Sequence, residues 1–265
     1  MKAFYPYIKI IFTLSLLNTK EWIYLRFFQI LLFFSLVLMV FGFLLSHLTF
    51  AAQDRLFYDF SFAGLELCLV FLVTAIGSHA LQREIDRRTM YVLLVRPIPK
   101  WTIIVSILGS IKILSILFII FFIFSALIAS SFNSIGSDVS IFPILIITFI
   151  TYLKSLLIAS FAICLSLLVR PILSLVMSIG YWLLNYSAPD LIFFLKKNNW
   201  QLIDVITQGL DYFIPQFYRM NWKAFEFVAQ PPTTEQLVWS VFHCLAWILF
   251  WTALSSYLFQ RKEIG

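Results

Sequence analysis

Six long runs of apolar residues constrain the fold of this chain more than any other feature. They cover residues 27–48, 61–81, 101–130, 141–169, 171–189 and 236–259. A helix needs about 20 apolar residues to cross a hydrocarbon layer of roughly 30 Å. The first, fifth and sixth runs contain no Asp, Glu, Lys or Arg. The sequence therefore predicts an all-α membrane protein with six transmembrane helices, built as a single domain over residues 1–265.

The overall composition also favours a membrane protein. Hydrophobic residues make up 62% of the chain and charged residues only 12%, whereas about a quarter of the residues are charged in soluble proteins. The net charge of +6 would suit a nucleic-acid partner, but most basic residues stand next to apolar runs. The positive-inside rule explains that placement better, so we expect no nucleic acid to bind.

The distribution of basic residues predicts the orientation. Six crossings place both termini on one side of the membrane. The segments on that side contain Lys2, Lys9, Lys20, Arg26, Arg83, Arg87, Arg88, Arg96, Lys100, Arg170, Arg261 and Lys262, whereas the opposite side contains Arg55, Lys196, Lys197, Arg219 and Lys223. Because Lys and Arg are enriched in cytoplasmic loops, both termini are predicted to be cytoplasmic.

Two segments outside the spans have a predicted place. Within the N-terminal segment 1–26, residues 7–17 are apolar but too short to cross, and we expect an elbow helix at the inner interface. The alternative is a secretory signal peptide, but no small-residue cleavage site follows and Lys20 and Glu21 intervene. Residues 190–235 are too few to build a core of their own and are predicted to rest on the outer face.

Sequence motifs for catalysis and nucleotide binding are absent. None of the eight glycines is followed by Lys, so there is no P-loop, and no G-x-S-x-G motif occurs. The histidines stand on separate spans and the cysteines occur singly, which favours packed residues over metal ligands or disulfides. We expect no enzyme activity, no metal and no cofactor in this chain.

Charge is concentrated in the segment 82–100, which reads QREIDRRTMYVLLVRPIPK. Glu84 and Arg88 have the i, i+4 spacing of a helical ion pair, and Pro97 and Pro99 end the helix. The pattern predicts a stiff, charged projection between the second and third spans. An ordinary positive-inside loop explains the arginines. It does not explain the acidic residues or the apolar run 90–95, which together suit docking to another protein.

This segment resembles the signature of ABC-2 type transporter permeases, in which an acidic and Arg-rich turn, a Thr, a Leu-Leu pair and a Pro-Ile-x-Lys ending follow the second span. The corresponding residues are Arg83, Glu84, Asp86, Arg87, Arg88, Thr89, Leu93, Leu94, Pro97, Ile98 and Lys100. An aromatic and proline-containing segment before the last span, 212–217, and a short basic tail agree with the same family.

The resemblance implies a permease subunit in the bacterial plasma (inner) membrane. Such a subunit pairs with a second permease copy or a homologous permease, and it binds two separate ABC ATPase subunits that hold ATP and Mg²⁺. The segment 82–100 would be the coupling loop. The expected activity is export of a lipid, a glycan or another bulky amphiphile, with membrane lipids and accessory envelope proteins as further partners. The alternative function is a non-transporting scaffold or assembly factor of an envelope complex.

Three ionisable residues lie within predicted spans: Glu66, Lys112 and Lys154. Each costs about 2.5 to 3.5 kcal/mol at bilayer depth, so each is expected to face protein or water. At 1.5 Å per residue, Lys112 lies roughly 16 Å beyond the start of its span, and an ion pair with Glu66 is geometrically conceivable. These residues either pair helices or line a translocation path. Lys154 has two further interpretations, an acidic lipid or the partner permease.

Overall fold

The computed structural model describes residues 5–48, 53–86, 99–131, 141–197, 215, 217–220 and 233–261. In these residues all regular structure is helical, which confirms the predicted all-α class. The helices are α1 (Tyr5–Ile23), α2 (Arg26–Leu48), α3 (Gln53–Asp86), α5 (Trp101–Ser131), α6 (Ile141–Leu168), α7 (Pro171–Lys197), the 3-10 helix η1 (Phe217–Met220) and α10 (Thr234–Arg261).

Five of the described helices are long and apolar enough to cross a membrane. The candidate spans are Arg26–Leu48, Phe57–Arg83, Trp101–Ile128, Ile144–Leu168 and Thr234–Arg261. They coincide with five of the six predicted spans. The remaining prediction, 171–189, falls in the first part of α7, which is not among the five. The chain is thus a multi-pass membrane protein, and the number of six crossings stays a prediction.

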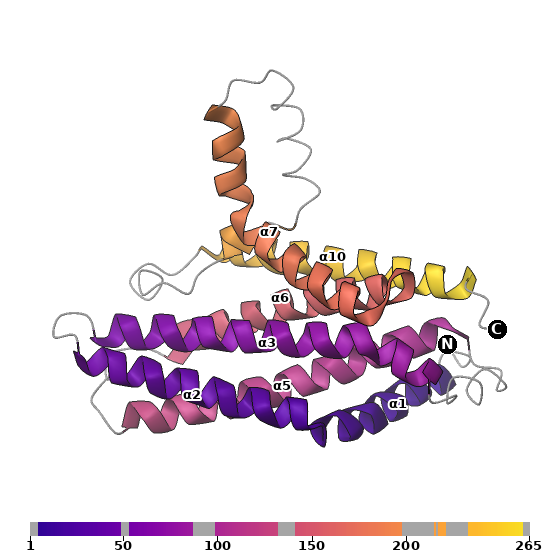
Figure 1. Cartoon of the computed structure of the whole chain (residues 1–265), viewed down its shortest axis with the longest axis horizontal. Coiled ribbons are helices and arrows are strands. Elements are labelled where there is room, and N and C mark those ends of the chain that lie inside the picture. Colours follow the sequence, from indigo (N-terminus) through magenta and orange to yellow (C-terminus); the bar gives the residue numbers. More distant parts are fainter. Residues whose placement is uncertain are drawn as a thin grey trace.

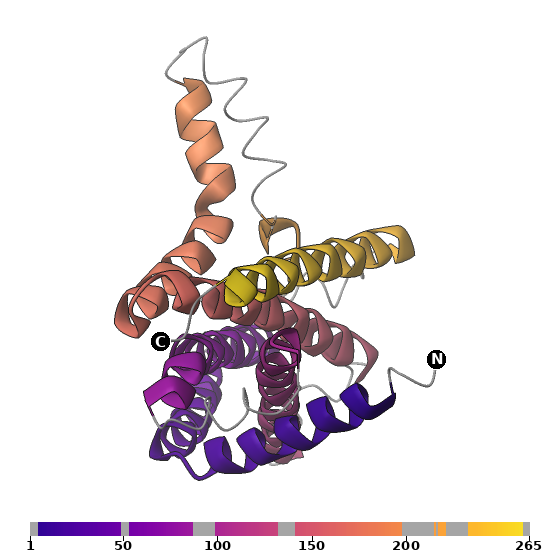
Figure 2. The same ribbon diagram turned by 90° about the vertical axis from the view of Figure 1, so that its right-hand side faces the viewer.

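The spans form a bundle around α3 and α6. Figure 1 shows α2, α3 and α5 running along the long axis, with α6 and α10 beside them. The most extensive contacts join α2 to α3, α3 to α6, α6 to α10, and α1 to α5. Figure 2 shows α1 lying across the group formed by α2, α3 and α5, where it packs mainly against α5.

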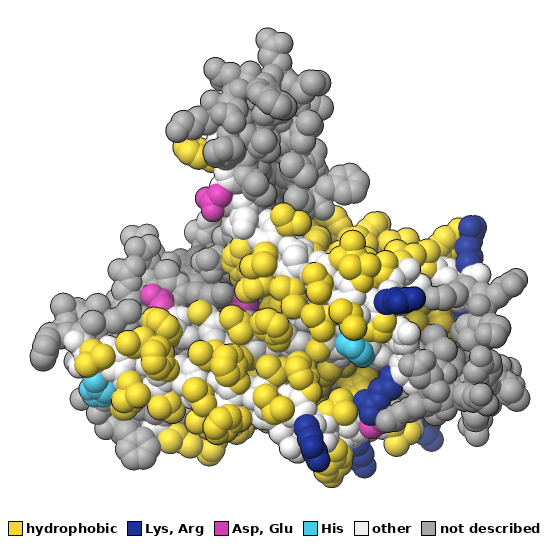
Figure 3. All heavy atoms as spheres, viewed as in Figure 1, with side chains coloured by type: hydrophobic (Ala, Val, Ile, Leu, Met, Phe, Trp, Pro, Cys, Tyr) yellow, Lys and Arg dark blue, Asp and Glu magenta, His cyan; other side chains and the backbone are white. Residues whose placement is uncertain are grey.

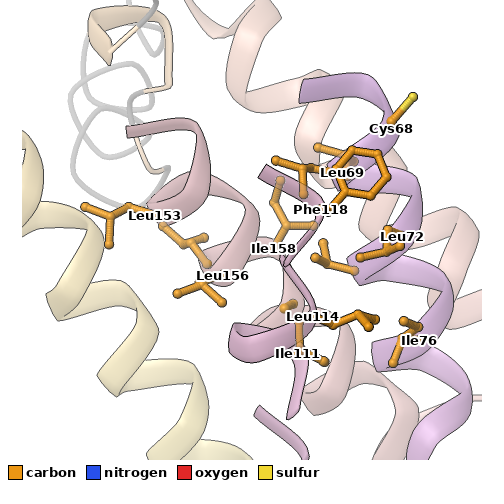
Figure 4. Close-up of a cluster of buried hydrophobic side chains, with 14 of the residues drawn as sticks. Cys68, Leu69, Leu72, Ile76, Ile111, Leu114, Phe118, Leu153, Leu156 and Ile158 are labelled. Carbon is orange, nitrogen blue, oxygen red and sulfur yellow. The ribbon is translucent and has the colours of Figure 1, made fainter. Parts of the chain in front are cut away.

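The core and the outer surface are both apolar. Inside, Leu69 and Leu72 of α3 pack with Leu114 and Phe118 of α5 and with Ile158 of α6 (Figure 4). Outside, large apolar side chains cover the bundle, and Lys and Arg gather toward the end where α3 finishes and α5 begins (Figure 3). An apolar belt with basic residues beyond it is the surface expected of a membrane-spanning bundle.

Both terminal helices reach the same end of the bundle. Tyr7 of α1 contacts the ring of Trp101, the first residue of α5, with 6.3 Å between ring centroids. The Lys100 ammonium donates a hydrogen bond to the carbonyl of Gln260 in α10, at 3.5 Å. The first turns of α1 and the last turn of α10 therefore each contact residues at the start of α5. That this end faces the cytoplasm stays a prediction.

Helix α7 departs from the straight span that its apolar sequence predicts. It begins next to the end of α6, follows the bundle and then bends, so that its second half stands away from the other helices (Figures 1 and 2). Pro189 lies within this helix, where its nitrogen has no hydrogen to donate to the carbonyl of Asn185. Proline is a common cause of such bends.

Candidate functional site

The structure describes the two ends of the predicted coupling loop. Arg83 lies near the end of α3, and its guanidinium is 2.8 Å from the Glu21 carboxylate of α1. Lys100, just before α5, contacts α10 through the Gln260 carbonyl. Each end of the loop is therefore fastened to a different helix. Of the other predicted loop residues, Glu84 and Asp86 belong to α3 but their side chains are outside the description, and Arg87, Arg88, Thr89, Leu93, Leu94 and Pro97 lie outside the described residues.

Helix α1 is joined to α5 by a seam of small residues. The Ser15 hydroxyl donates to the Ser106 carbonyl at 3.0 Å, and the Thr19 hydroxyl donates to the Ser110 carbonyl at 3.4 Å. A Cβ added at Gly109 would lie only 2.5 Å from the Ser15 hydroxyl oxygen. Small residues at a membrane interface allow such close backbone approach. The face of α5 that carries Ser106, Gly109 and Ser110 is thus the surface on which α1 lies.

The second constellation is a buried polar cluster formed by Glu66 of α3, Lys154 of α6 and two aromatic residues of α7. Glu66 and Lys154 are each 1% exposed. Each lies about 20 Å from the first residue of its helix, at 1.5 Å per residue. The Tyr186 hydroxyl donates to Glu66 Oε1, and the Trp182 indole donates to the same oxygen at 3.2 Å. The Lys154 ammonium in turn donates to the Tyr186 hydroxyl at 2.9 Å.

Tyr186 bridges the two charges of this cluster. The Lys154 nitrogen is 3.9 Å from Glu66 Oε2, longer than a charge-assisted hydrogen bond of about 2.7 to 2.9 Å. The Tyr186 hydroxyl accepts from the ammonium and donates to the carboxylate, so it connects both ions. Removing two ions from water costs several kcal/mol per ion, which only close pairing and additional hydrogen bonds offset. The cluster therefore ties α7 to the most enclosed pair of helices, α3 and α6.

The structure corrects one sequence-based pairing. Glu66 has Lys154 as its cationic neighbour, whereas Lys112 is exposed on α5. The side chain of Lys112 shares its helical face with exposed Ile116 and Ile120, because positions four residues apart lie on one face. The ion pair between Glu66 and Lys112 that the sequence allowed is therefore wrong. A role for Glu66, Lys112 or Lys154 in a translocation path stays a prediction.

A group of aromatic residues beside the cluster was not recognised from the sequence. Tyr181 of α7 stacks on Phe161 of α6, with 4.1 Å between ring centroids, and Phe161 meets Trp251 of α10 edge-on at 4.8 Å. The Tyr181 hydroxyl and the Trp251 indole nitrogen are both buried in this group. The polar tips of Tyr181, Trp182 and Tyr186 make the middle of α7 polar toward the bundle. The available signal was the run YWLLNY, which sets polar-tipped aromatic residues four and five positions apart in an otherwise apolar segment.

No arrangement of the described side chains suits a metal: in these parts of the chain no three His, Cys, Asp or Glu residues come together. The three cysteines are free and buried, as predicted. The fold and the two polar constellations define a multi-pass helical membrane protein with one cluster of charges inside its bundle.

A comparison with protein families identifies the particular class. The sequence model of the family described as "ABC-2 family transporter protein" matches residues 45–264, which is most of the chain. The chain therefore belongs to this family. It is therefore the membrane subunit of an ABC-2 transporter, and membership implies that ATPase subunits partner it. No curated protein matches the sequence.

Proposed function

We propose that the chain forms half of a translocation pathway, with a second permease copy or a homologous permease as the other half. Separate ATPase subunits bind the segment 82–100 on the cytoplasmic side and drive export of a lipid, a glycan or another bulky amphiphile across the bacterial plasma (inner) membrane. The observation that carries this proposal is the family match over residues 45–264, together with the charged segment that lies inside it.

The contacts at the two ends of the loop support a mechanical role. A push on the segment 87–98 reaches α3 and α5 directly, because these helices continue from it. It also reaches α1 through Arg83 and Glu21, and α10 through Lys100 and the Gln260 carbonyl. A motion of the loop is thereby passed to four helices at one end of the bundle.

The test is co-purification of the tagged chain with a separate ABC ATPase subunit. We expect the tagged permease to bring down an ATPase that hydrolyses ATP. The double substitution Arg87→Glu/Arg88→Glu should reduce the bound ATPase at least about tenfold, because unpaired charges at an interface cost 2 to 5 kcal/mol or more.

Arg170→Glu is the matched control, because Arg170 is an exposed basic residue in the turn between α6 and α7. It should leave ATPase binding unchanged. Two results would contradict the proposal: failure of any ATPase to bind, or labelling of a cysteine at position 87 by a membrane-impermeant maleimide added outside intact cells.

A further inference from the structure

Helix α7 presents the reverse of an ordinary amphipathic pattern. Its fully buried side chains, among those described, are all polar: Ser174, Ser178 and Asn185. Several of its large apolar side chains, such as Val176 and Leu183, are more than half exposed. In a membrane, a helix that faces the bundle with polar groups gains no hydrophobic stabilisation there, because lipid solvates its apolar side equally well. Its attachment depends on particular hydrogen bonds.

Few of these bonds join α7 to other helices. The Ser178 hydroxyl and the Asn185 amide nitrogen both donate to carbonyls of α7 itself. At the start of the helix, Ser174 donates to the Ala162 carbonyl of α6 at 3.1 Å. At mid-helix, Trp182 and Tyr186 donate to Glu66. The described attachment of α7 thus combines a hydrogen bond near its start, the stacking of Tyr181 on Phe161, and charge-assisted contacts about two and three turns after Ser174.

We propose that α7 is a hinged wall of the translocation path, and that the bonds from Tyr186 and Trp182 to Glu66 form a latch that holds it closed. This inference rests on the proposed function. Ser174 marks the hinge and Tyr186 the latch. When the latch opens, the inward polar face of α7 is uncovered for passage of a polar headgroup.

The geometry gives the latch two stable states. With α7 closed, Tyr186 connects Glu66 and Lys154. With α7 open, the ammonium and the carboxylate need to approach by only about 1 Å from their 3.9 Å separation to reach direct charge-assisted hydrogen-bonding distance. The two charges therefore stay neutralised in both states, and opening leaves no unpaired ion inside the bundle. Tyr186 and Trp182 act here as positioning residues for α7.

A native cysteine reports on the latch. Cys244 of α10 is fully buried and is covered by η1, where its sulfur is 3.5 Å from that of Met220. The η1 helix packs against α7, with the Phe217 ring 6.1 Å from the Tyr186 ring. Release of Tyr186 should loosen this cover and expose the thiol.

The experiment measures the rate at which N-ethylmaleimide alkylates Cys244 in the full chain in lipid nanodiscs. Cys68→Ala and Cys164→Ala leave Cys244 as the single thiol, since the chain has three cysteines. Tyr186→Phe and Trp182→Phe keep the aromatic packing but remove a hydrogen-bond donor to a carboxylate. Each should accelerate alkylation about tenfold, the change expected for losing one charge-assisted bond. Tyr24→Phe is the matched control on an exposed tyrosine and should leave the rate unchanged.

A double-mutant cycle separates the latch from general loosening. If Tyr186 acts through the Glu66 carboxylate, Tyr186→Phe should add little to the rate once Glu66→Gln is present, because coupled residues are not additive. Independent, additive effects of the two substitutions would overturn the latch. An unchanged rate in both Tyr186→Phe and Trp182→Phe would overturn it as well.

The link to transport is tested in the complex with the ATPase. Wild-type Cys244 should be alkylated about tenfold faster when vanadate traps the nucleotide-bound state than without nucleotide, while Tyr186→Phe should be fast in both states. The ATPase could bind and hydrolyse ATP while the alkylation rate of wild-type Cys244 stays the same with and without nucleotide. In that case the hinged wall is wrong and the proposed function stands. If no ATPase binds, the proposed function fails by itself.

Discussion

Two helices at the edge of the bundle, α1 and α7, are attached in opposite ways. Helix α1 lies on α5 through hydroxyl-to-carbonyl bonds and close backbone approach at Gly109, and one ion pair at its end adds to this. Helix α7 is attached to α3 through bonds that converge on the single carboxylate of Glu66. The first attachment is spread over several turns of helix, whereas the second is concentrated at one point.

The difference bears on which helix can move. A seam made of many weak contacts has no single residue whose release frees the helix, so α1 should follow α5 as one body. A contact made by a few strong bonds can switch as a unit, because the partners exchange one bonding arrangement for another. We therefore expect α1 to transmit motion from the loop and α7 to respond to it.

The largest effect should come from breaking the buried ion pair. Glu66→Leu leaves Lys154 buried without its carboxylate, and we expect a loss of about 3 to 5 kcal/mol in the free energy of unfolding. Unfolding in mixed detergent micelles, followed by circular dichroism, measures this loss.

The paired substitution Glu66→Leu/Lys154→Met removes both charges and should recover most of that stability, because apolar replacement of a whole buried pair is often neutral. Lys112→Met is the comparison, since Lys112 is an exposed lysine at a comparable depth; its removal leaves no buried carboxylate behind and takes a costly charge out of the bilayer, so it should not lower stability. Equal losses for Lys154→Met and Lys112→Met would contradict the description of a bridged, buried pair.

An intermediate effect should follow from crowding the α1 seam. In Gly109→Leu the added Cβ meets the Ser15 hydroxyl, and we expect a loss of about 1 to 3 kcal/mol from overpacking. Adding Ser15→Gly removes the clashing atoms and should restore part of the loss. Gly180→Leu is the control, because a Cβ at Gly180 meets no atom within 4 Å. A loss for Gly180→Leu as large as that for Gly109→Leu would show that helix propensity, and not the seam, sets the effect.

The sequence predicted the parts of the fold that depend on hydropathy alone. Long apolar runs can only be membrane or core helices, so five of the spans were found close to their true positions. The sequence also contains the spacing that underlies the seam, because Ser106 and Ser110 stand four residues apart and mark a face that another helix can approach closely. The partner of that face, α1, was not predictable, since a small-residue pattern does not specify which helix lies on it.

The charged cluster shows where sequence reasoning ended. Glu66 and Lys154 were recognised as costly and therefore functional or paired, but axial depth alone led to Lys112, not Lys154, as the partner considered for Glu66. Depth along a helix says nothing about which way a side chain points around it, and this rotation separates Lys154 from Lys112. Tyr186 and Trp182 were overlooked because hydropathy rates aromatic residues as suitable for lipid, although their polar tips need partners when buried.

The smallest effect should come from the exposed ion pair at the base of the loop. Arg83 and Glu21 are 28% and 37% exposed, so water and salt screen their attraction, and Glu21→Gln should cost only about 0.2 to 1 kcal/mol. The loss should shrink further at about 1 M salt, where the screening length falls to roughly 3 Å. The loss caused by Glu66→Leu should not depend on salt, because the buried pair is shielded from ions. Unfolding measured for both variants at low and high salt therefore tests the contrast between the two attachments. A salt-independent loss for Glu21→Gln would place this ion pair in the same class as the buried one.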